Sequence, residues 1–155
     1  MERLKEALSA AGIAYKENEP LCAHCTFRIG GPADLFVLPE NEEQLCAAIR
    51  LAKEAGVRSY LLGNGSNILF EDAGYRGAVI NVSAMKSGIG VIENISFPGK
   101  DPALTYDAVV VGAGQMLSSL CMAALENSLT GLEFAYGIPG TVGGAVYMNA
   151  GAYGG

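Results

Sequence analysis

Short β-rich runs closed by turn residues are the feature that most constrains how this chain can fold. Such runs are typical of strands when Gly, Pro, Asn or Asp bounds them. Their number exceeds that of the helical stretches, and the sequence therefore predicts an α+β fold. They lie within TFRIGGPADLFVLP (26–39), VRSYLLGNGSNILF (57–70), GAVINVS (77–83), IGVIENIS (89–96) and DAVVVGAG (107–114).

Three stretches have helical periodicity. Residues 2–11 predict a short amphipathic helix that we expect to be an appendage. A second helix follows Asn41 as its cap, has acidic residues in its first turn and ends at Gly56. A third helix covers about 116–129. The segment PGKDPALTYD, residues 98–107, predicts a surface connection. The apolar faces expected to pack are Leu45, Ala48, Ile49 and Ala52 in the second helix, and Leu117, Leu120, Cys121, Ala124 and Leu125 in the third.

Composition and charge narrow the class of protein. The chain has 155 residues, 50% of them hydrophobic, which suffices for one folded domain with a core. It shows no secretory h-region and no run of about 18 apolar residues, so we expect a cytoplasmic protein without a membrane span. A net charge of −6 argues against a nucleic-acid partner, which clustered basic side chains would bind. An anionic ligand would then be bound largely by backbone N–H groups.

The four cysteines do not form the pattern of a structural metal site. Cys22 and Cys25 flank His24, the only histidine, whereas Cys46 and Cys121 occur singly in helical stretches. A closed zinc site needs four ligands, usually from two paired clusters. We therefore expect no bound metal and reduced thiols, as is usual in cytosolic proteins.

The segment LLGNGSN spans Leu61 to Asn67, and its residues Gly63, Asn64, Gly65, Ser66 and Asn67 directly follow an apolar run. Its glycines allow a tight turn with outward amides, and its short polar side chains can donate hydrogen bonds to an anion. This pattern fits a phosphate cradle, but an Asn-Gly hairpin turn accounts for it equally well.

A second candidate segment is VVVGAGQML, residues 109–117, in which a strand leads through Gly112 and Gly114 into a helix. The order resembles the start of a Rossmann fingerprint. However, Leu117 stands where the third glycine belongs, and Glu133 lies in a glycine-rich segment and not at the tip of a second strand. We therefore expect a dinucleotide fold of another kind.

The third candidate is GLEFAYGIPGTVGGAVYMNAGAYGG, residues 131–155, in which eight of 25 positions are glycine and Glu133 is the only formal charge. Bare backbone can approach a flat heteroaromatic ring and donate N–H groups to it. Tight turns alone are the alternative, although one turn rarely needs so many glycines. The positions concerned include Pro139, Gly140, Thr141, Gly143 and Gly144.

Three blocks, TFRIGGPADLFV, LLGNGSNILF and LTGLEFAYGIPGTVGGAVYMNAGAYGG, together closely resemble the MurB family, the UDP-N-acetylenolpyruvoylglucosamine reductases of peptidoglycan precursor synthesis. The resemblance covers about 26–155. It implies a two-subdomain FAD-binding module of the vanillyl-alcohol oxidase (PCMH) type, with FAD held non-covalently between the subdomains. Residues 1–25 would be an N-terminal helix and lead-in, and 26–155 a FAD-binding domain that is incomplete at its C-terminus and lacks the substrate-binding domain.

The resemblance also implies which residues bind FAD. Gly63–Asn67 would hold the pyrophosphate, and the segment 137–145 would lie along the flavin, with Gly140 and Thr141 nearest the ring. Gly112 and Gly114 would line the cleft, and Asn149–Ala152 would complete it. The cofactor-binding set is thus Leu62, Gly63, Asn64, Gly65, Ser66, Asn67, Gly112, Gly114, Pro139, Gly140, Thr141, Gly143, Gly144, Ala145, Asn149, Gly151 and Ala152.

In the family reaction, NADPH reduces the flavin, and the enolpyruvyl sugar nucleotide then receives the hydride and a proton. The family's serine, arginine and glutamate for this step lie downstream of the GAYGG block, so the resemblance assigns no catalytic residue to this sequence. We expect residues 1–155 alone to be inactive. The alternative is a non-catalytic nucleotide-binding or regulatory module that retains the fold.

Overall fold

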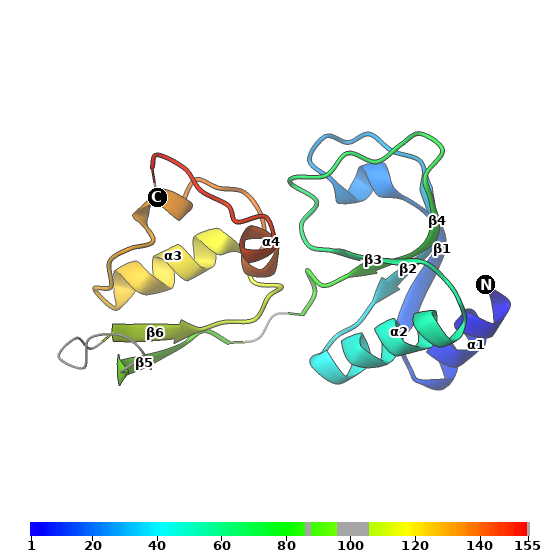
Figure 1. Ribbon diagram of the computed structural model, residues 1–155, viewed down its shortest axis with the longest axis horizontal. Coiled ribbons are helices and arrows are strands. Elements are labelled where there is room, and N and C mark those ends of the chain that lie inside the picture. Colours follow the sequence, from blue (N-terminus) through cyan, green and yellow to red (C-terminus); the bar gives the residue numbers. More distant parts are fainter. Residues whose placement is uncertain (86–87, 96–105, 155) are drawn as a thin grey trace. The chain divides into compact units, whose positions relative to one another are not determined.

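The computed structural model (Figure 1) describes residues 1–85, 88–95 and 106–154. The chain divides into two compact units, Met1–Met85 and Lys86–Gly155. Most of the predicted connection PGKDPALTYD, positions 98–105, lies outside the described residues.

The first unit is built on a four-stranded mixed sheet. Its strands are β1 (Ala14–Pro20), β2 (Pro32–Leu38), β3 (Ser59–Leu62) and β4 (Tyr75–Asn81), in the order β1-β2-β4-β3. β1 is antiparallel to β2, whereas β2, β4 and β3 run parallel. The predicted strands at β2, β3 and β4 are confirmed. β1 was not predicted, because AYKENEP is a polar edge strand with no apolar alternation to mark it.

Both faces of this sheet are covered. Figure 1 shows α1 (Glu2–Ala10) and α2 (Glu42–Glu54) on one face, with η1 (Leu21–His24) and the chain that follows β3 on the other. The buried cluster under the helices is Leu4, Leu8, Ile13, Leu35, Val37, Ala48, Ala52, Ala78 and Ile80. The cluster on the opposite face is Leu21, Cys25, Ala33, Phe36, Leu62, Phe70 and Val79. Burial on both faces explains why β2 and β4 are nearly continuous apolar runs.

The local signals of α2 are confirmed, whereas two packing predictions in this unit are wrong. The Asn41 side chain accepts a hydrogen bond from the Gln44 amide, and the chain leaves the helix at Gly56 with φ +66°.

Ile49 is exposed, because α2 buries a narrower stripe than expected. Residues 2–11 are no appendage, since Leu4 and Leu8 are fully buried in the core, and the first compact unit includes residues 1–25.

The second unit combines an antiparallel pair, β5 (Gly90–Ile95) and β6 (Tyr106–Val110), with α3 (Leu117–Glu126), η2 (Glu133–Ala135) and α4 (Val142–Tyr147). Its core is Leu117, Leu120, Cys121 and Ala135. Burial raises the pKa of the Cys121 thiol, which serves here as a small apolar group. The prediction that Leu125 packs is wrong, since its side chain is exposed. Among the described residues, none of the helices combines the length and apolar character that a membrane crossing requires.

Candidate functional site

One edge of the sheet in the first unit gathers several polar groups. Because β2, β3 and β4 run parallel, their carboxyl ends meet at this edge. Gly63 directly follows β3 there, and Asn81 is the last residue of β4. Ligands of open α/β sheets bind beside such edges, where the loops leave the strands. The predicted segment Gly63–Asn67 therefore starts at a favourable place for a ligand.

The segment Gly63–Asn67 is not a hairpin turn. A two-residue Asn-Gly hairpin joins antiparallel neighbours, whereas β3 and β4 are parallel. The segment instead packs on the chain after η1, where the Thr26 amide donates to the Gly65 carbonyl at 3.0 Å. Gly65 has φ +65°, and the side chains of Asn64 and Asn67 are exposed.

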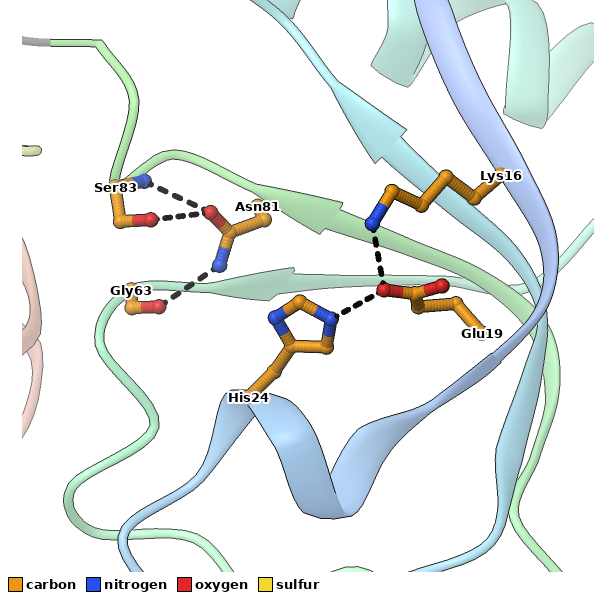
Figure 2. A network of polar contacts seen from close by, with 6 residues as sticks. All are labelled: Lys16, Glu19, His24, Gly63, Asn81 and Ser83. Carbon is orange, nitrogen blue, oxygen red and sulfur yellow. Dashed lines mark hydrogen bonds and ion pairs between the residues drawn. The ribbon is translucent and has the colours of Figure 1, made fainter.

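Asn81 fixes the start of this segment. Its side chain is only 5% exposed, and its Nδ2 donates to the Gly63 carbonyl at 2.9 Å. Its Oδ1 accepts hydrogen bonds from the Ser83 amide and hydroxyl (Figure 2). The sequence patterns did not indicate this residue. A buried polar residue at the end of an apolar strand, GAVIN, is the signal that could have identified it.

We expect Asn81→Ala to lower the free energy of unfolding by about 2 kcal/mol, because it leaves the Gly63 carbonyl and the Ser83 donors without their partner. Urea unfolding of the chain measures this loss. Asn64→Ala is the matched control, since its exposed side chain should contribute less than about 0.5 kcal/mol. Equal losses in the two variants would contradict the role of Asn81.

A hollow of about 410 Å³ lies at this edge. Among the side chains that line it, Arg28 carries a permanent positive charge, and hydroxyl and amide groups supply further hydrogen-bonding atoms. Polar walls and one guanidinium suit an anionic group. The lining residues are Ala23, His24, Cys25, Thr26, Arg28, Gly63, Asn64, Asn81 and Ser83.

The Glu19 carboxylate contacts both His24 and Lys16 (Figure 2). Glu19 Oε1 is 2.8 Å from His24 Nε2 and 2.8 Å from Lys16 Nζ. The hydrogen bond from Lys16, and after it that from His24, lowers the pKa of the Glu19 carboxyl. Glu19 is therefore ionised at neutral pH. In the part of the chain that the structure describes, no three His, Cys, Asp or Glu side chains lie close enough to hold a metal ion.

In the second unit, the two predicted cofactor segments pair with each other. Met116 and Thr141 form an antiparallel bridge. The Gly143 amide donates to the Ala113 carbonyl at 2.9 Å, and the Val142 amide donates to the Gln115 carbonyl at 2.8 Å. The turn that contains Gly112 and Gly114 is thus brought against Gly140–Gly144.

Several glycines of this segment are required by the chain itself. Gly140 has φ +136°, and a Cβ on Gly143 would lie 2.7 Å from the Ala113 Cβ. Thr141, only 1% exposed, accepts a hydrogen bond from the Gly144 amide and caps α4, which was not predicted. Internal packing therefore explains part of the glycine density that the sequence assigned to a ligand. Beyond α4, Asn149 has φ +46°, and Gly151 is exposed.

The G-x-G turn does not belong to a Rossmann fold. β6, the strand that precedes Gly112, pairs antiparallel with β5 in a two-stranded sheet. A Rossmann fingerprint requires a parallel βαβ unit at this place. The expectation of a different dinucleotide fold agrees with this topology.

A larger hollow, about 630 Å³, lies within the second unit along α3. Its lining includes Ser118, Ser119 and Glu126 but none of the predicted cofactor residues. Glu126 would repel an anionic ligand, so the smaller hollow in the first unit is the better candidate for a phosphate site. The predicted residues Leu62–Asn67 belong to the first unit, and those from Gly112 to Ala152 belong to the second.

Comparison with known proteins gives a consistent result. The model of the FAD binding domain family matches residues 33–155. A UDP-N-acetylenolpyruvoylglucosamine reductase of Clostridium perfringens is 41% identical over 160 aligned residues, which cover 100% of this chain and 48% of that protein. This chain thus spans about half the length of the curated relatives it matches.

Solved structures agree with these matches. The crystal structure of UDP-N-acetylenolpyruvylglucosamine reductase (MurB) from Thermus caldophilus is similar with a TM-score of 0.60 and 30% identity, over 91% of this chain and 43% of that one. A VAO-type flavoprotein from Myceliophthora thermophila has a TM-score of 0.54 at 18% identity, over 66% of this chain and 18% of that one. The latter likeness concerns the fold alone, and it confirms the predicted α+β module of the vanillyl-alcohol oxidase type.

Proposed function

This chain belongs to the FAD binding domain family, and on that premise we propose that it is the FAD-binding part of a reductase acting on UDP-N-acetylenolpyruvoylglucosamine. The observation that carries the proposal is the polar hollow at the carboxyl edge of the sheet, which Gly63, Asn64 and Asn81 line. The hollow shares Gly63 and Asn64 with the loop to which the resemblance assigns the pyrophosphate of FAD. The family match and the names of the relatives support the rest.

The residues present fit a diphosphate. The loop after β3 has glycine at Gly63 and Gly65, and Asn81 anchors its first carbonyl, so the loop is held before a ligand arrives. Backbone amides and the Arg28 guanidinium can then share the negative charge. This explains how a chain with a net charge of −6 can bind an anionic cofactor.

In the second unit, the segment 137–145, which includes Pro139 to Ala145, would lie along the flavin, and Gly112 and Gly114 would line the cofactor cleft. Pairing between the two segments keeps this backbone in place. Gly140 and Thr141 would lie nearest the ring, and Asn149–Ala152 would complete the cleft. The bound FAD supplies hydride transfer, which no protein side chain can perform. The protein contributes binding, orientation and the exclusion of water.

The activity of the whole protein is part of the proposal. NADPH would be the hydride donor, and the product would be UDP-N-acetylmuramate for peptidoglycan synthesis, cell-wall biogenesis and cell division. The proton donor and the groups that polarise the substrate would belong to the part of the relatives that this chain does not match. We propose a cytoplasmic location and no nucleic-acid or membrane partner, in keeping with four free cysteines and the acidic balance.

Titration of the purified chain with FAD tests this proposal. We expect a yellow complex with a protein-bound flavin spectrum, which would also separate the reductase part from a module without a redox role. Failure to bind excess FAD would contradict the proposal.

Asn67→Ala should weaken FAD binding by about 1 kcal/mol, roughly a fivefold rise in Kd, because it removes one side-chain hydrogen bond while the loop amides remain. Fluorescence titration measures the Kd. The unfolding midpoint is the control and should not change, since Asn67 is exposed. An unchanged Kd would show that the side chain does not contact the cofactor.

A further inference from the structure

The His24 side chain lines the hollow of the first unit. One edge and one face of its imidazole ring contact neighbouring side chains, which fix the position of the ring. Its Nε2 is 2.8 Å from Glu19 Oε1, and its ring stacks on Phe36 with a centroid separation of 4.0 Å and an interplanar angle of 24°. The side chain is 24% exposed. A ring fixed in this way can present its remaining edge to a ligand without further ordering.

The remaining edge carries Nδ1. Figure 2 shows this nitrogen on the side of the ring that faces Gly63 and Asn81, the residues that start and anchor the candidate phosphate loop. Within the described ranges, Nδ1 has no hydrogen-bond partner, whereas Nε2 is bonded to Glu19. The free nitrogen therefore faces the place where a bound anion would lie.

The contact with Glu19 determines whether His24 Nδ1 donates or accepts a hydrogen bond. Ionised Glu19 only accepts, so Nε2 carries a hydrogen in both charge states of the ring. Nδ1 of the neutral ring is then an acceptor and would repel a phosphate oxygen, which also only accepts. Nδ1 of the protonated ring is a donor and forms a charge-assisted hydrogen bond with the same oxygen.

We propose that His24 is a ligand-binding residue of this hollow, and that binding of the FAD diphosphate is coupled to protonation of its imidazole. This inference rests on the proposed function. It assigns a defined role to a residue that the sequence offered only as a possible metal ligand. Its consequence is that FAD affinity falls as the pH rises through the range in which imidazole titrates.

Other charged groups near the His24 ring do not account for the proposed pH dependence of FAD affinity. Lys16 offsets Glu19, so the group of three has no net charge when the ring is neutral and a charge of +1 when the ring is protonated. Arg28, on the segment that follows η1, keeps its charge throughout the tested pH range. Asp34, on the same strand as Phe36, is paired with Arg76. Cys25 also lines the hollow, and Tyr75 packs against the cluster that contains Phe36.

The chain allows a direct test, because His24 is its only histidine. The proton NMR signals of the imidazole C–H groups can be followed from pH 5.5 to 9 in the free chain and in the FAD complex. We expect the midpoint of the titration to be higher in the complex. Riboflavin, which lacks the diphosphate, should not raise it.

Binding measurements on variants give an independent readout. For the wild type, the Kd for FAD should be about tenfold lower at pH 6 than at pH 8.5. His24→Gln should reduce this ratio to less than about twofold, since glutamine does not titrate. Arg28→Gln is the matched control from the same hollow, and it should weaken binding at both pH values while leaving the ratio unchanged.

The outcomes separate this inference from the proposed function. Absence of FAD binding at every pH would overturn both. FAD binding with an unchanged or lower NMR midpoint would overturn the role of His24 alone. A Kd that falls with rising pH would mean that Nδ1 accepts a hydrogen bond from a ligand hydroxyl, and the proposed protonation would then be wrong.

Discussion

Replacing Gly65 by valine is expected to abolish detectable FAD binding and to lower the free energy of unfolding by about 3–5 kcal/mol. Gly65 has φ +65°, a conformation that a β-branched residue rarely adopts. A Cβ there would lie 2.0 Å from the His24 carbonyl oxygen and 2.8 Å from the Cys25 Cα. Both neighbours are backbone, so the loop or η1 must move. The substitution thus disturbs both the candidate phosphate loop and a contact of this loop within the chain.

Gly56 provides a matched control for this variant. It has almost the same backbone conformation, φ +66°, but a Cβ there would meet nothing within 4 Å. Gly56→Val should therefore cost only the conformational strain, about 1–2 kcal/mol, and leave the Kd for FAD unchanged. Urea unfolding and FAD titration of both variants separate the two causes. Similar losses in the two variants, or wild-type FAD affinity in Gly65→Val, would contradict the packing of this loop on η1.

A protein consisting of residues 1–155 and loaded with FAD is expected not to reduce the enolpyruvyl sugar nucleotide at an enzymatic rate. Hydride transfer requires a substrate positioned over the ring, and the reduction is completed by a placed proton donor. Positioning and general acid catalysis together contribute many orders of magnitude to a rate. The chain spans about half the length of its relatives, and the resemblance assigns the catalytic groups to the other half.

Anaerobic mixing of the FAD-loaded chain with NADPH and then with the sugar nucleotide measures this directly through flavin absorbance. A full-length relative, such as the reductase of Clostridium perfringens, is the positive control under the same conditions. Substrate-dependent reoxidation of the chain at about 1 per second or faster would be typical of enzymes. Such a rate would show that the catalytic groups already lie within residues 1–155.

The candidate site could be predicted only in part. The loop Gly63–Asn67 could be proposed from the sequence because its glycines and short polar residues follow an apolar run within a few positions. Asn81 was missed, although it anchors the same loop, because its partner Gly63 is 18 residues away. His24 was read only as a possible metal ligand, since its contacts with Glu19 and Phe36 require η1 to fold back on the sheet.

Elements whose causes are local could be predicted from the sequence alone. Asn41, the acidic first turn and Gly56 mark α2 within one helix length, and the short apolar runs mark β2, β3 and β4. The order of the helices and strands indicated an α+β fold, and the three motif blocks indicated the family. These features depend on backbone conformation and on side chains that are close together in the sequence, so the sequence is enough to predict them.

Which distant segments contact one another could not be predicted from the sequence and is known from the folded chain. The polar run AYKENEP becomes β1 because β2 offers it an edge, and α1 joins the core because its Leu4 and Leu8 reach the same sheet. In the second unit, a glycine is required at Gly143 because a Cβ there would clash with Ala113. Each of these outcomes rests on a contact between residues distant in sequence, and the free energy of such a contact exists only once the chain has brought both partners together.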